Sequence, residues 1–126
     1  MKNREEEITD DTLVILFGSR ARGTERMDSD ADIGILSAFG HKLSASEKIS
    51  LAEKISRQLG VSEDKIDLVD LSRASPLLQY QAAREGRILF GSTAKFIRFQ
   101  VLAWKRYLST AKFRRMREQS LAKKYA

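Results

Sequence analysis

The chain has no cysteine, one proline and one histidine among its 126 residues. Without cysteine, disulfide bridges and zinc–thiolate sites are excluded. No apolar run approaches the ~20 residues of a membrane-spanning helix, and residues 1–7 lack the apolar stretch of a signal peptide. The apolar content of 42% is ordinary for a globular protein. We therefore expect one cytoplasmic domain over residues 1–126, large enough to bury a core.

Charge is distributed unevenly along the sequence. The formal net charge is +6, but residues 94–126 hold ten Lys or Arg against the single acid Glu118, a local charge of +9. Residues 1–93 hold thirteen basic against sixteen acidic side chains, a charge of −3. Such asymmetry is typical of a surface that binds an acidic partner, RNA or protein, although a solvated helix face has the same composition.

Strand and helix signals alternate along the chain. The apolar run 13–17 predicts a buried strand. Residues 44–47 (Ser-Ala-Ser-Glu) form a capping box that opens a helix, and Ser75-Pro76 opens a second one. Residues 87–90 predict a further short strand. This alternation indicates an α/β or α+β domain with a small sheet covered by helices, and it leaves strand order and direction open.

From about Thr93 the pattern becomes that of one long helix. Apolar residues recur there at alternating steps of four and three, which places them in one stripe. The stripe consists of Ile97, Val101, Trp104, Leu108 and Ala111. It could dock on the chain's own sheet, which we favour, or meet a helix of a partner.

A loop rich in small residues follows the first strand. It reads Gly18-Ser19-Arg20-Ala21-Arg22-Gly23. Gly18 lets the backbone approach a ligand, and Ser19 offers a hydroxyl and an N–H to phosphate oxygens. Arg20 and Arg22 could clamp triphosphate charge, although at least one is expected to face solvent. A glycine–serine pair alone is more often just a turn.

Two carboxylates follow this loop in Ser29-Asp30-Ala31-Asp32. Residues two apart on an extended chain point to the same face, so Asp30 and Asp32 repel each other unless a cation neutralises them. Mg²⁺ is favoured because it takes carboxylates together with substrate phosphate oxygens. An Asp-rich surface turn capped by Ser29 explains the pair equally well.

A third carboxylate, Asp67, interrupts the apolar stretch 66–69. A charge there needs a compensating partner, which metal shared with Asp30 and Asp32 would supply. In a two-metal site Asp67 would hold the ion beside an attacking hydroxyl and assist its deprotonation. Asp70 is expected on the opposite side of that strand and is left out of the group.

The pattern Gly-Ser-x-Ala-x-Gly, five residues, Ser-Asp-x-Asp and a later lone Asp resembles the DNA polymerase β nucleotidyltransferase superfamily. More narrowly, the chain resembles the minimal nucleotidyltransferases, antitoxins that are paired with HEPN-domain ribonuclease toxins. The resemblance covers nearly the whole chain. It implies a small mixed sheet with flanking helices and a long C-terminal helix, and a catalytic core over residues 1–92 followed by the basic helix 93–126.

The resemblance also implies Mg²⁺, ATP as substrate, and transfer of AMP to a tyrosine of the cognate toxin, with which the chain would form a hetero-oligomer. Carried over, Gly18 and Ser19 would hold the β- and γ-phosphates, Asp30 and Asp32 would bind metal, and Asp67 would complete the nucleophile-side metal site. The sequence departs from the family at Ile33-Gly34, where bulkier aliphatic pairs are usual.

Three other functions stay open. An antitoxin could act by binding alone, with the long basic helix masking the toxin. Nucleotidyl transfer to a small molecule is a second possibility, but such relatives usually carry an added domain for which this chain has little room. Direct RNA binding is disfavoured because no aromatic platform or RNA-binding motif is present.

Overall fold

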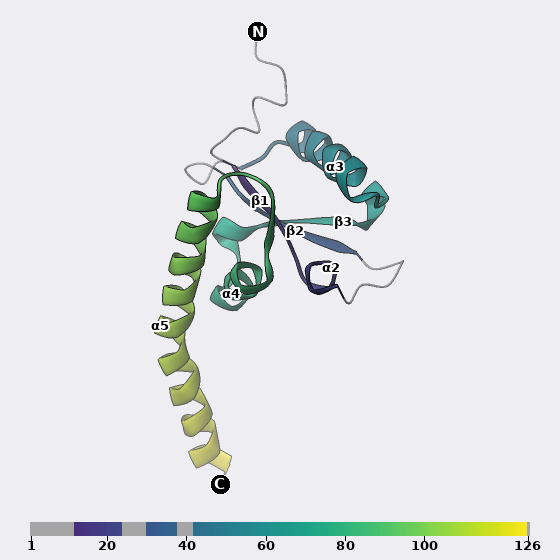
Figure 1. The fold of residues 1–126 in the computed structure, drawn as a ribbon. Coiled ribbons are helices and arrows are strands. Elements are labelled where there is room, and N and C mark those ends of the chain that lie inside the picture. The colour runs from purple at the N-terminus through teal and green to yellow at the C-terminus, as the bar shows by residue number, and fades with distance from the viewer. Residues whose placement is uncertain (1–11, 24–29, 38–41, 126) are drawn as a thin grey trace.

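Helices and strands alternate along the chain, as predicted (Figure 1). The computed structural model describes residues 12–23, 30–37 and 42–125. The elements, with η marking short 3₁₀ helices, are β1 (Leu13–Phe17), α2 (Ser19–Arg22), β2 (Ala31–Leu36), α3 (Ala45–Leu59), η2 (Glu63–Lys65), β3 (Ile66–Asp70), η3 (Leu71–Arg73), α4 (Pro76–Glu85), β4 (Arg87–Phe90) and α5 (Thr93–Tyr125). A small mixed sheet with flanking helices and a long final helix confirms the predicted fold class.

The four strands form one sheet in the order β3-β2-β1-β4. β1 is antiparallel to both of its neighbours, whereas β2 and β3 are parallel and are connected through α3. All five residues of β1 are buried. A central strand covered on both faces reads as a continuous apolar run, which explains the unbroken Leu-Val-Ile-Leu-Phe sequence.

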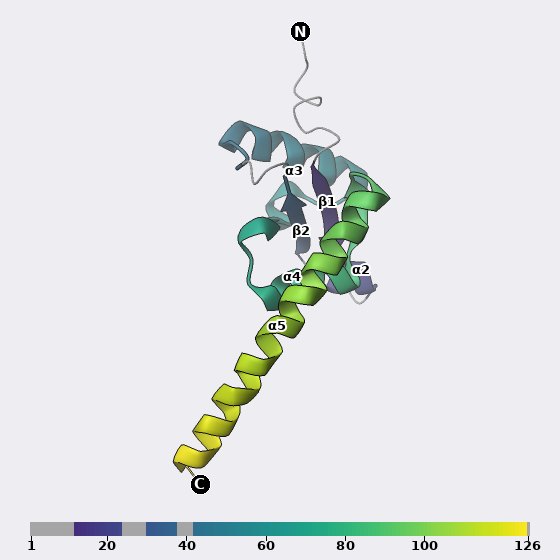
Figure 2. The same ribbon diagram turned by 90° about the vertical axis from the view of Figure 1, so that its left-hand side faces the viewer.

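Helices cover the two faces of the sheet, and each face has its own apolar cluster. α3 packs on one face, and α4 and α5 pack on the other, so that α5 lies on the side of the sheet away from α3 (Figures 1 and 2). The α3 cluster contains Val14, Leu16, Ala31, Ile33, Ile35, Leu51 and Ile55. The other contains Leu13, Ile15, Phe17, Leu71, Ala82, Ala83, Phe99 and Ala103. Alternation along β2 therefore turns residue 32 toward α4.

Both predicted helix starts are confirmed. The Ser44 hydroxyl accepts a hydrogen bond from the Glu47 N–H at 3.2 Å, and the Glu47 carboxylate accepts one from the Ser44 N–H at 3.0 Å. The Ser75 hydroxyl accepts from the Leu78 N–H at 3.2 Å, with Pro76 at the first helical position. These caps satisfy backbone donors that have no partner inside a helix.

Gly34, where the sequence departs from the family pattern, makes room for a core side chain. A Cβ at this position would lie 2.6 Å from Cδ1 of Leu71, which is fully buried. η3 thus fills the space beside β2 that a larger residue would occupy.

α5 packs on the domain through a different face from the one we favoured. Phe99 and Ala103 are buried, and Phe96 packs against the same cluster. The predicted stripe points elsewhere, and four of its members are between 44% and 57% exposed: Ile97, Val101, Trp104 and Leu108. Docking of the stripe on the chain's own sheet is therefore wrong. The helix carries two apolar rows, and the row with the small Ala103 is the one that approaches the domain.

The C-terminal half of α5 extends well beyond the rest of the molecule (Figures 1 and 2). Of the helices in the described ranges, none is both long enough and apolar enough to cross a membrane.

Candidate active site

A pocket of about 530 Å³ opens at the end of the sheet where β1 finishes and β2 and β3 begin. Its floor comes from the three strands and the loop after β1, and its side comes from α4. The lining residues are Phe17, Gly18, Ser19, Asp32, Asp67, Val69, Leu78, Gln81 and Glu85. Four of the predicted site residues, Gly18, Ser19, Asp32 and Asp67, thus meet at one pocket.

The strand register places Asp32 directly opposite Asp67 on the parallel strands β2 and β3. Residues paired in this way point to the same face of the sheet, and neighbouring strands lie about 4.8 Å apart, so the two carboxylates are close neighbours at the pocket. Asp67 is exposed because β3 is an edge strand, whereas Asp32 is half-buried. Like charges directly opposite each other destabilise a sheet, and a bound cation would relieve this repulsion.

Gly18 brings the loop backbone against Asp32. Its φ of 78° and ψ of −154° lie in a region that is open to glycine alone. A Cβ at Gly18 would clash with Oδ2 of Asp32. Its own backbone conformation therefore requires glycine, and a larger residue there would displace the Asp32 carboxylate. Ser19 follows as the first residue of α2, and Gly23, with φ 75°, ends this short helix in the predicted tight turn.

Asp30 is the predicted carboxylate that does not line the pocket. It precedes β2, is exposed, and is not among the described residues that line the pocket. Within the described ranges, no three side chains of the types His, Cys, Asp or Glu come together as a metal site. A metal-binding role of Asp30 stays a prediction, and its neighbour Ser29 is outside the described residues.

The two arginines of the loop are placed on α2. Arg20 is half-buried, and its carbonyl accepts a hydrogen bond from the Arg87 guanidinium at 3.0 Å, which ties α2 to β4. The side chain of Arg22 is outside the described part of the structure. Their binding to phosphate stays a prediction.

Gln81 and Glu85 line the pocket, although no motif in the sequence points to them. They lie with Leu78 along one side of α4, at spacings of three and four residues. The spacing was visible in the sequence. The sequence does not show which side of α4 faces the carboxylates, because that depends on how the helix packs on the sheet.

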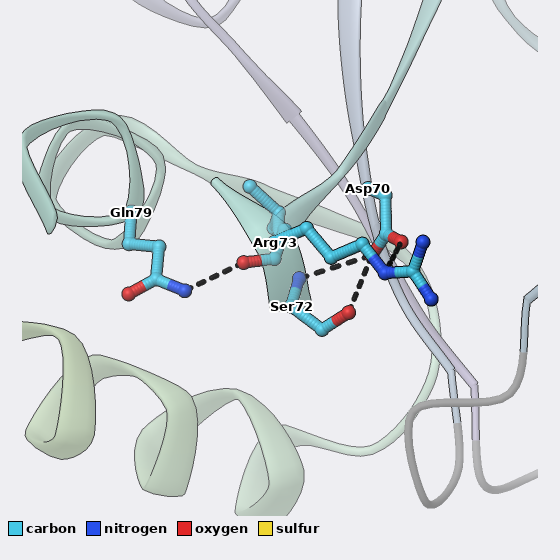
Figure 3. A network of polar contacts seen from close by, with 5 residues as sticks. Asp70, Ser72, Arg73 and Gln79 are labelled. Carbon is cyan, nitrogen blue, oxygen red and sulfur yellow. Dashed lines mark hydrogen bonds and ion pairs between the residues drawn. The ribbon is translucent and has the colours of Figure 1, made fainter. Parts of the chain in front are cut away.

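Asp70 faces away from the carboxylate pair, as expected. Its carboxylate accepts hydrogen bonds from the Ser72 N–H at 3.0 Å and the Ser72 hydroxyl at 2.6 Å, and it lies 3.7 Å from the Arg73 guanidinium (Figure 3). Asp70 is therefore a capping residue of η3.

A buried glutamine connects the pocket strand to the helices. Gln79 of α4 is 4% exposed and donates to the Leu71 carbonyl at 2.6 Å (Figure 3). Its own carbonyl accepts from Arg106 of α5 at 2.9 Å. The segment after β3, the helix at the side of the pocket and α5 are thereby held together.

A loop with an obligatory glycine, set against paired carboxylates on neighbouring strands, is the architecture of a nucleotidyltransferase. The family model described as polymerase beta nucleotidyltransferase matches residues 3–95, and the chain belongs to this family.

Particular relatives confirm the narrower resemblance. The chain is 38% identical over 80 residues to the protein adenylyltransferase MntA of Shewanella oneidensis, which is 64% of this chain and 54% of that protein. Among solved structures it is similar to a toxin–antitoxin with AMP-PNP, with 28% identity, a TM-score of 0.67 and coverage of 95% of this chain and 99% of that chain. It is also similar to a chain of the tri-AMPylated Shewanella oneidensis HEPN toxin in complex with MNT antitoxin, with 26% identity, a TM-score of 0.61 and coverage of 92% and 88%. The aligned part thus spans little more than half the length of the MntA sequence.

Proposed function

We propose that the chain is an antitoxin that transfers AMP from ATP to a tyrosine hydroxyl of a HEPN toxin. The observation that carries this proposal is the pairing of Asp32 with Asp67 beside Gly18 and Ser19 at one pocket. The similarity to MntA and to complexes with a HEPN toxin supports the choice of acceptor. A hetero-oligomer with the toxin and a cytoplasmic location, where ATP is present, belong to the same proposal.

In the proposed reaction, the acceptor oxygen attacks the α-phosphorus of ATP. The bond from that phosphorus to the bridging oxygen of the β-phosphate breaks, and pyrophosphate leaves. The backbone at Gly18 and the Ser19 hydroxyl hold the β- and γ-phosphates. Asp67, on the exposed edge strand, takes the proton of the attacking hydroxyl. Catalysis rests on positioning and on stabilising charge that develops on the phosphate oxygens.

The donor set fits Mg²⁺. This ion is usually held by one or two carboxylates together with water and substrate phosphate oxygens, so a pair such as Asp32 and Asp67 is sufficient. When bound, the ion would supply charge neutralisation for the phosphate oxygens. Asp30, just before β2, is the proposed additional ligand of a two-metal site.

A purely binding antitoxin is the second candidate. The exposed apolar residues of α5 favour it, because a surface of this kind could mask a toxin without any chemistry.

The test is incubation of the chain with Mg²⁺, α-labelled ATP and the cognate toxin. We expect label on the toxin and release of pyrophosphate with the wild type. The double variant Asp30→Asn, Asp32→Asn should transfer at least about 10³-fold more slowly, because it lacks the charges that hold metal and phosphate.

The matched control is the double variant Glu63→Gln, Asp64→Asn, which removes two exposed acids of η2 outside the pocket. It should transfer AMP like the wild type. A wild type that neutralises the toxin without labelling it, together with an equally potent Asp30→Asn, Asp32→Asn variant, would replace the enzymatic proposal by the binding one.

A further inference from the structure

Four apolar side chains on α5 form a row that nothing covers within the described part of the chain. We call Ile97, Val101, Trp104 and Leu108 the seam. They are spaced by four, three and four residues, which is the spacing of the contact positions of a coiled coil. Each is at least 44% exposed, although α5 is packed on its own domain through another face. The seam therefore has the form of a helix-binding surface without its helix.

One flank of the seam is uniformly basic. Arg98, Lys105 and Lys112 follow one another at intervals of seven residues and are all exposed. They occupy positions from which side chains of a coiled coil form ion pairs with the partner.

The other flank of the seam is occupied by the chain itself. Gln100 donates to the Ala83 carbonyl at 3.0 Å, and the Tyr107 ring stacks on Tyr80 with centroids 4.2 Å apart. A partner that fits the seam must therefore bring acidic side chains to the basic flank.

The charge pattern argues against a second copy of this chain. Two antiparallel seams would bring the basic rows face to face, and two parallel seams would set each basic row against Gln100, Tyr107 and Arg114. Neither arrangement supplies an acid, and like charges across an interface are unfavourable. RNA fits poorly as well, because the only aromatic side chain in the seam is Trp104 and base stacking needs a series of them.

We propose that the HEPN toxin docks on the seam through an amphipathic helix whose apolar stripe is flanked by acidic residues. The identity of this partner rests on the proposed function. α4 connects the two surfaces, since Gln79 and Tyr80 contact α5 and the next residue, Gln81, lines the pocket. Docking on the seam would thus hold the acceptor hydroxyl close to the pocket and raise its effective concentration.

The test compares two double variants of the full chain. Val101→Glu, Leu108→Glu places charges in the seam. Leu102→Glu, Phe113→Glu places the same charges on the same helix outside the seam, at residues that are 60% and 69% exposed. Because all four side chains are exposed, neither variant should lose the fold, which a thermal melt checks.

Affinity for the toxin is measured by calorimetry without ATP, and AMP transfer is then measured at increasing toxin concentration. For the seam variant we expect a Kd at least about 30-fold weaker, as for loss of the anchor residues of an interface. Its KM for the toxin should rise in proportion while kcat at saturating toxin changes by less than about twofold. The control variant should stay within about threefold of the wild type in all three quantities.

Each outcome separates the docking site from the chemistry. If the wild type transfers AMP and the seam variant binds the toxin as tightly as the wild type does, the docking site is wrong and the proposed function stands. If the wild type binds through the seam without transferring AMP, the docking site stands and the enzymatic function falls. A wild type that does not bind the toxin, or whose seam binds a single-stranded RNA 20-mer or a second copy instead, overturns the docking proposal.

Discussion

Tertiary contacts fix the residues of the pocket, whereas the residues of the seam are aligned only by the repeat of one helix. At the pocket, strand register sets Asp32 opposite Asp67, and Gly18 holds the loop against them in a backbone conformation that glycine alone adopts. Along the seam, only the helix repeat aligns the side chains, and they are exposed. Changes at the pocket should therefore act on the rate of the chemical step, whereas changes at the seam should act on affinity for the partner.

A large loss in the rate of the chemical step is expected from Gly18→Ala. The new Cβ would clash with Oδ2 of Asp32, and the residue would have to leave its backbone conformation, since that region of φ and ψ is open to glycine alone. We expect AMP transfer to fall about 100-fold or more, with toxin affinity unchanged, measured by labelled ATP and by calorimetry.

Gly23→Ala is the matched control, because Gly23 also has a positive φ but a Cβ there meets no atom of the described residues within 4 Å. It should cost about 1–2 kcal/mol of backbone strain and leave transfer within about threefold of wild type. Equal losses of transfer in the two variants would show that loop strain, and not crowding of Asp32, is responsible.

A smaller effect, on thermal stability, is expected from a change at Gln79, which links the pocket side of the domain to α5. Gln79→Leu removes the donor to the buried Leu71 carbonyl and the acceptor for Arg106. Loss of a buried hydrogen bond costs about 1 kcal/mol, and the Leu71 carbonyl keeps a longer bond from the Ala74 N–H at 3.4 Å, so the melting temperature should fall by roughly 4–8 °C. Gln58→Leu on the exposed side of α3 should shift it far less. Equal shifts in the two variants would mean that Gln79 does not join the helices as described.

Local signals predicted most of the elements. The capping box at Ser44 and the proline at position 76 fix helix starts through contacts within a few residues, and these appear directly in the sequence. Strand order was not predictable, because the pairing of β1 with β4 joins residues more than 70 positions apart. The face of α5 that packs on the domain was predicted wrongly, since both apolar rows have helical spacing and the choice between them depends on tertiary contacts with α4.

The site was predictable in part. The motif selected Gly18, Ser19, Asp32 and Asp67, all of which line the pocket. The register that sets the two carboxylates opposite each other, and the contribution of Gln81, depend on tertiary packing and leave no local signal. The sequence also did not explain why a glycine stands at position 34, because the side chain that occupies the space beside it belongs to Leu71, far along the chain.

If the carboxylate pair at the pocket carries out AMP transfer, two acids of β3 must differ in their effect on its rate. Asp67 lines the pocket, and Asp70, three residues later, caps η3 on the other side. We would measure the initial rate of AMP transfer to the toxin for Asp67→Asn and Asp70→Asn under identical conditions. We expect a loss of about 10²-fold or more for Asp67→Asn and a change of less than about threefold for Asp70→Asn. Equal rates for the two variants would exclude a role of Asp67 in the transfer.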